Sequence, residues 1–93
     1  MDDKVTIRIK DTEYAIRGSD DREQILKAAE YVDKKLREIN KFKKELSEDK
    51  KAVLTALDIA GDYFQLIKEK EVLLAEINNR SKRLLQRLDL ALN

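Results

Sequence analysis

The chain offers little material for catalysis, because its 93 residues include no histidine and no cysteine. These residue types supply most catalytic triads, thiolate nucleophiles and zinc ligands. Carboxylates are abundant, but the close pairs Asp20–Asp21 and Glu69–Glu71 stand among basic residues, as solvated surface acids do. A glycine-rich phosphate loop is absent as well. We therefore expect a protein that is not an enzyme and that uses no cofactor or metal.

Basic residues are the other group that could do chemistry. One cluster contains Lys41, Lys43, Lys44, Lys50 and Lys51, and another contains Lys82, Arg83 and Arg87. Acids stand beside both clusters, no aromatic residues are interleaved, and the net charge is only +1. Domains that bind nucleic acid are usually far more basic. The pattern favours a solvated face, or a charged rim that orients a protein partner, over nucleic-acid binding.

The hydropathy of the chain bears on its location. No apolar run approaches the ~18 residues that a membrane-spanning helix needs, and residues 1–15 lack the apolar core of a signal peptide. The lack of cysteine fits a reducing compartment. We expect a cytoplasmic protein that does not bind membranes.

Two alternating segments near the start predict strands. Val5, Ile7 and Ile9 alternate with polar residues, and Tyr14 and Ile16 do the same after a break at Asp11–Thr12. A period of two describes a half-buried strand, so the pair predicts a β-hairpin with its turn at Asp11–Thr12. With helices to follow, the fold class is α+β.

The rest of the chain predicts two helices. Asp20 and Glu23 have the spacing of a capping box, and an apolar stripe follows at Ile25, Ala29, Val32, Leu36 and Ile39. We expect Phe42 and Leu46 to pack beneath the connecting loop, and Ser47 to cap a second helix over residues 48–92. That helix would be ~67 Å long, so its end must project or pair with other chains. We assign residues 1–60 to a globular head and 61–93 to an oligomerisation stalk.

The long helix carries a heptad repeat. With Leu57 at an a position, the a/d series is Val53, Leu57, Ala60, Phe64, Ile67, Glu71, Leu74, Asn78, Ser81, Leu85, Leu88 and Leu92. A repeat of 3.5 residues held this long predicts a left-handed coiled coil. Asn78 either fixes the register or, with Glu71 and Ser81, marks a weak stretch.

A second apolar seam runs beside the first. It contains Tyr63, Leu66, Leu73, Ile77, Leu84 and Ala91, at c and g positions. Two adjacent seams exceed what one partner helix can cover, so they predict a dimer that pairs again into a homotetramer. The candidate oligomerisation residues are Phe64, Ile67, Leu74, Ile77, Asn78, Leu84, Leu85, Leu88 and Leu92.

Three segments resemble the bacterial cell division protein ZapA family. VTIRIKDTEYAIRG (residues 5–18) is similar to its opening hairpin, while AAEYVDKKLREIN (28–40) and KKAVLTALDIAGDYFQL (50–66) are similar to its helical signatures. The most specific run is residues 52–60. The family usually has Gly where this chain has Asp11, and Asn where it has Asp58.

The resemblance implies a small cytoplasmic protein at the division site that binds the tubulin-like protein FtsZ. Members dimerise and tetramerise through the coiled coil and cross-link FtsZ filaments, without catalysis or a cofactor. The implied binding surface lies on the head, and the exposed candidates on this chain are Arg8, Arg17, Lys50, Lys51 and Asp58.

These expectations combine into a bridging mechanism, with two alternatives. An antiparallel pair of parallel dimers would carry heads at both ends and hold two filaments together. The first alternative is a generic coiled-coil adaptor whose head binds another protein. The second is a nucleic-acid-binding dimer, whose affinity would fall steeply with salt.

Overall fold

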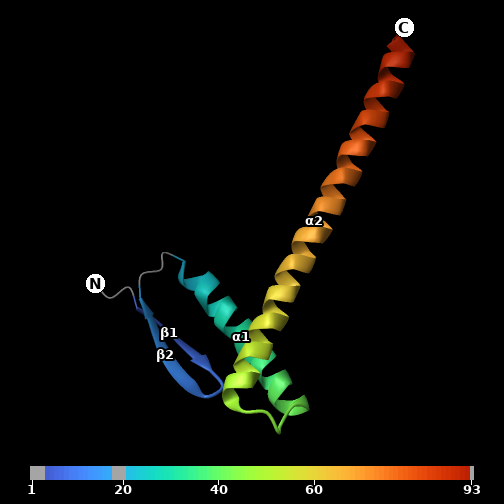
Figure 1. Ribbon diagram of the computed structural model, residues 1–93. Coiled ribbons are helices and arrows are strands. Elements are labelled where there is room, and N and C mark those ends of the chain that lie inside the picture. Colours follow the sequence, from blue (N-terminus) through green and yellow to red (C-terminus); the bar gives the residue numbers. More distant parts are fainter. Residues whose placement is uncertain (1–3, 18–20, 93) are drawn as a thin grey trace. The chain divides into compact units, whose positions relative to one another are not determined.

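The two alternating segments form the expected hairpin in a computed structural model, which describes residues 4–17 and 21–92 (Figure 1). Strand β1 (Lys4–Ile9) pairs antiparallel with β2 (Thr12–Arg17). The predicted turn was wrong by one residue, because Thr12 pairs with Ile9 and the turn consists of Lys10 and Asp11. Their φ angles are 50° and 67°, and positive φ at both central residues is the requirement of a type I′ turn.

One face of the hairpin packs against helix α1 (Arg22–Phe42). Val5 and Ile7 of β1 are buried with Ala29 of α1, and Ile9 and Ile25 pack at the edge of this cluster. Every member of the predicted stripe on α1 is at least partly buried, as expected. The core therefore lies between β1 and α1.

The β2 half of the same face is more open. Tyr14 stands opposite Ile7 and Ile16 opposite Val5, so their side chains point to the face that α1 covers. Both are nevertheless exposed, because α1 packs against β1 rather than β2.

The ends of α1 differ from the prediction in two ways. Its N-cap is Asp21, whose side chain accepts a 3.0 Å hydrogen bond from the Gln24 backbone N–H. The predicted capping residue, Asp20, lies outside the described residues. Phe42 was wrongly predicted to pack beneath the loop: it is the last residue of α1 and is 74% exposed. The ammonium of Lys41 lies 5.9 Å from the centroid of the Phe42 ring.

Helix α2 (Glu48–Leu92) confirms the predicted long helix. The Ser47 hydroxyl caps it by accepting from the Lys50 backbone N–H at 3.3 Å, and Gly61 does not interrupt it. By its internal contacts the chain divides into two units, residues 1–60 and 61–93. No helix in the described part of the chain is both long and apolar enough to span a bilayer.

Candidate protein-interaction site

The hairpin turn is fixed to α1 by charged side chains. The backbone N–H of Lys10 donates to Oδ1 of Asp33 at 2.6 Å. Arg37 donates from Nε to the other Asp33 oxygen at 2.9 Å, and its terminal nitrogen reaches Oδ1 of Asp11 at 3.3 Å. The two turn residues and two residues one helical turn apart on α1 therefore form one network.

The turn also contacts the beginning of α2. Nζ of Lys10 donates to Oε2 of Glu48 at 2.7 Å. This bond is the largest cause that lowers the pKa of Glu48, while the hydrogen bond from the Lys10 backbone N–H is the largest cause that lowers the pKa of Asp33. The hydrogen bond to Asp33 raises the pKa of Arg37. These contacts favour the charged form of all three groups.

Arg8 and Arg17 both lie on the outer face of the hairpin, away from α1, four residues apart along the strands. In the register, Lys4 is opposite Arg17 and Arg8 is opposite Glu13, all on this face. Arg8 approaches Glu13 at 3.8 Å, with both side chains largely exposed. A pair so open to water contributes little to stability, so the Arg8 guanidinium remains accessible to a partner.

Lys51 was wrongly predicted to be exposed. Lys51 is only 5% exposed. Its Nζ donates a 2.7 Å hydrogen bond to Oδ1 of Asn40 and lies 3.5 Å from Oε1 of Glu48. The sequence predicted exposure because Lys51 stands in a run of charged residues at the start of a helix. Its hydrogen-bond acceptor, Asn40, comes from the other helix, 11 residues earlier. Lys51 is a structural lysine in this chain.

The remaining two candidates on α2 differ from each other. Asp58 forms a 3.2 Å ion pair with Lys35 of α1, and the Lys35 side chain is mostly buried. Lys50 is exposed and lines a groove at the start of α2. No pattern in the sequence indicated Lys10, Asn40 or Lys35 as partners, whereas the four-residue spacing of Asp33 and Arg37 is typical of an ion pair along a helix.

The predicted oligomerisation residues leave a long apolar surface on α2. All of them except the partly buried Ile67 are exposed in the single chain. Soluble monomers rarely expose a large continuous apolar surface, so a surface of this kind indicates contact with another protein. In the described residues, no three acidic side chains gather in a way that would hold a metal ion.

The model of one protein family, Cell division protein ZapA, matches residues 5–88 of the chain. The chain belongs to the ZapA family. A Cell division protein ZapA of Pseudomonas aeruginosa is 40% identical over 92 residues, which cover 95% of this chain and 86% of the relative. The family explains the resemblance of the hairpin and both helices, and it is a family of cell division proteins.

Two solved structures share the fold. One is an unknown conserved bacterial protein from P. aeruginosa, with a TM-score of 0.73, 34% identity, and coverage of 94% of this chain and 97% of that one. The other is a mutant dimer of ZapA from Geobacillus stearothermophilus, with a TM-score of 0.63, 32% identity, and coverage of 84% and 91%. A mutant of one family member thus forms a dimer.

Proposed function

We propose that this protein binds FtsZ through the outer face of its hairpin and cross-links FtsZ filaments at the division site by self-association of α2. The observation that carries the proposal is the family match over residues 5–88. Arg8 and Arg17 are the proposed contact residues on the head. Lys51 is left out because it is buried, and Asp58 because it is paired with Lys35.

The exposed apolar face of α2 supports self-association. Residues 61–93, the proposed stalk, hold both apolar seams, and the first continues back into the head through Val53 and Leu57. Burial of leucine, isoleucine and phenylalanine against another helix contributes about 1.5–3 kcal/mol for each side chain. A dimer on the first seam leaves the second seam free for a further pairing.

The charge pattern of the stalk supports an antiparallel second pairing. Residues 61–77 contain four acids and two lysines, whereas the segment between Asn78 and Leu88 contains four basic residues and no acid. An antiparallel pair centred near Asn79 sets the acidic half of each chain against the basic half of the other. A parallel pair in register would set like charges side by side, which destabilises an interface.

Such an assembly presents heads at two ends, and this is the proposed mechanism. Each head contacts a filament weakly, and the joined heads act with a high effective concentration, so several weak contacts make a stable bundle. Bridging requires only binding and assembly, and no bond is made or broken.

The test is to mix the purified protein with FtsZ and GTP, pellet the polymer, and examine it by electron microscopy. We expect the protein in the pellet and the filaments in bundles. Absence from the pellet at every salt concentration would reject FtsZ as the partner and leave an adaptor for another protein. Sedimentation equilibrium separately tests bridging, which is rejected if no species exceeds a dimer.

A further inference from the structure

Helix α2 has two different sides where it passes through the head. Lys51, Thr55 and Asp58 are spaced four and three residues apart, so they share one side, and Lys51 and Asp58 contact α1 from there. Val53 and Leu57 lie on another side and are 60% and 64% exposed. The chain thus buries a lysine and a threonine and exposes apolar residues, an arrangement that suits a second protein surface on α2 within the head.

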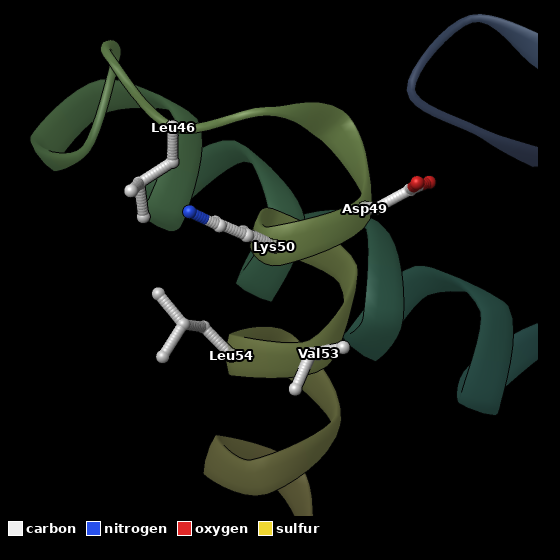
Figure 2. A pocket seen from close by; sticks show the side chains of 5 residues that line it. All are labelled: Leu46, Asp49, Lys50, Val53 and Leu54. Carbon is white, nitrogen blue, oxygen red and sulfur yellow. The ribbon is translucent and has the colours of Figure 1, made fainter.

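A groove lies on this exposed side, at the very start of α2 (Figure 2). Its lining consists of Leu46, Asp49, Lys50, Val53 and Leu54. In Figure 2 the side chains of Leu46, Lys50 and Leu54 line one side, and Asp49 and Val53 lie toward the other. The apolar residues of the lining are Leu46, Val53 and Leu54. The Lys50 side chain extends between Leu46 and Leu54, and the Asp49 carboxylate points to the opposite side.

The heptad register explains this combination of residues. When the a/d series is continued back from Val53 to the start of α2, Lys50 takes an a position and Asp49 a g position, and Leu46, in the loop before α2, stands where the preceding d residue would fall in the sequence. In a parallel coiled coil, each side chain at a or d inserts into a hole formed by four residues of the facing helix. For position 50, that hole would consist of positions 46, 49, 50 and 53. Residues 49, 50 and 53 belong to α2 and Leu46 to the loop before it, and all four line the groove.

We propose that this groove is filled by a second copy of the chain, which inserts its own Lys50. The four methylenes of that lysine would cover Leu46 and Val53, and its ammonium would pair with Asp49 at the edge. The contact is reciprocal across a two-fold axis, so each dimer contains it twice. A lone lysine at an a position selects one register, and here Asp49 compensates its charge.

The inference rests on the dimer in the proposed function and extends it into the head. It also gives Lys50 a role distinct from FtsZ binding. In this arrangement the two helices meet from the first turn of α2 onward, and the charges at positions 49 and 50 align the two heads.

Single cysteines test the arrangement directly, because the natural chain has none. Val53→Cys places thiols at facing d positions, close enough to oxidise to an interchain disulfide. Ala52→Cys, one residue away and off the seam, is the negative control, and Leu74→Cys reports the seam in the stalk. We expect Val53→Cys and Leu74→Cys to cross-link on a non-reducing gel at least tenfold faster than Ala52→Cys.

The outcomes separate the two proposals. If only Leu74→Cys cross-links, the dimer stands and its extension into the head is wrong. If neither cross-links, the parallel dimer itself is wrong. FtsZ co-sedimentation does not enter this experiment, so a failure to bind FtsZ leaves its result intact.

A charge exchange tests the role of Lys50. Lys50→Asp sets two acids together in each groove and Asp49→Lys sets two lysines together, so each single variant should weaken the dimer about tenfold in sedimentation equilibrium. The double variant restores opposite charges and should recover most of that loss. Equal dimer affinity in all four proteins would show that position 50 does not face Asp49.

Discussion

The backbone N–H of Lys10 donates a 2.6 Å hydrogen bond to Oδ1 of Asp33, across 23 residues of sequence. Lys10 has a φ of 50°, a left-handed conformation that costs a non-glycine residue about 1 kcal/mol. The bond to Asp33 holds the turn in this conformation and joins it to α1. The hairpin is therefore positioned by a carboxylate as well as by its small apolar core.

The first prediction concerns the pH dependence of this contact. Because the pKa of Asp33 is lowered in the folded protein, its stabilising contribution is complete above the pKa of an unfolded aspartate, about 3.9, and is lost as the pH falls through the folded value. Asp33→Asn keeps an acceptor for the Lys10 N–H but has no charge. We expect it to be less stable than the natural chain at neutral pH and equally stable in strong acid.

Urea denaturation at a fixed protein concentration, repeated from neutral pH into strong acid, measures this difference. Asp89→Asn, which removes an exposed acid near the end of α2, is the control and should leave the acid-dependent part of the curve unchanged. A constant difference between Asp33→Asn and the natural chain at all pH values would contradict the assignment.

Thr55 is the subject of the second prediction. It is 3% exposed, and within the described structure its hydroxyl oxygen has no hydrogen-bond partner. Thr55→Val replaces this hydroxyl with a methyl of similar size and should raise the free energy of unfolding by about 1 kcal/mol. Thr55→Ser keeps the hydroxyl, removes a methyl, and should lower it by about 1 kcal/mol. Thermal denaturation checks the order Val, Thr, Ser, and a less stable valine variant would mean that the hydroxyl is satisfied in the assembly.

The third prediction concerns Gly61 in the interior of α2. A Cβ built at this position meets no atom within 4 Å in the single chain. Gly61→Ala should therefore stabilise the helix by about 1 kcal/mol, the difference in helix propensity. Ala75→Gly, two heptads further along at the equivalent position, should cost a similar amount. Loss of stability in Gly61→Ala, measured by urea denaturation, would indicate that a partner helix approaches closely at this glycine.

Features that depend on interactions between residues close in sequence could be predicted, and features that depend on residues distant in sequence could not. The strands, the stripe on α1 and the full length of α2 arise from local periodicity, and the structure confirms them. The predicted exposure of Lys51 and the predicted burial of Phe42 were wrong, because burial depends on residues distant in sequence. The charge or apolarity of a side chain alone does not indicate it. The turn was misplaced by one residue because neither Lys10 nor Asp11 is the glycine or asparagine that marks a type I′ turn.

The fourth prediction tests the head surface. Arg8→Gln and Arg17→Gln each remove one charge from the outer face of the hairpin, where neither side chain is buried. We expect each to lower FtsZ co-pelleting several-fold without a change in oligomeric state. Lys44→Gln removes the same charge from the loop between the helices and should leave co-pelleting unchanged. An equal loss in all three would indicate attraction by overall charge, and no loss in any would move the contact away from the hairpin.

The last prediction tests the antiparallel second pairing. Glu76 and Arg83 are seven residues apart, so they flank the second seam on the same edge. An antiparallel pairing centred near Asn79 sets Glu76 of one dimer against Arg83 of the other, twice for each helix pair.

Arg83→Glu should therefore shift the tetramer toward the dimer, and so should Glu76→Arg. The double variant recreates opposite charges and should restore the tetramer in sedimentation equilibrium, most clearly at low salt, where charge pairs are least screened. Bundling of FtsZ should follow the tetramer through this series, while co-pelleting of the heads persists. A double variant as dimeric as the single variants would contradict this register.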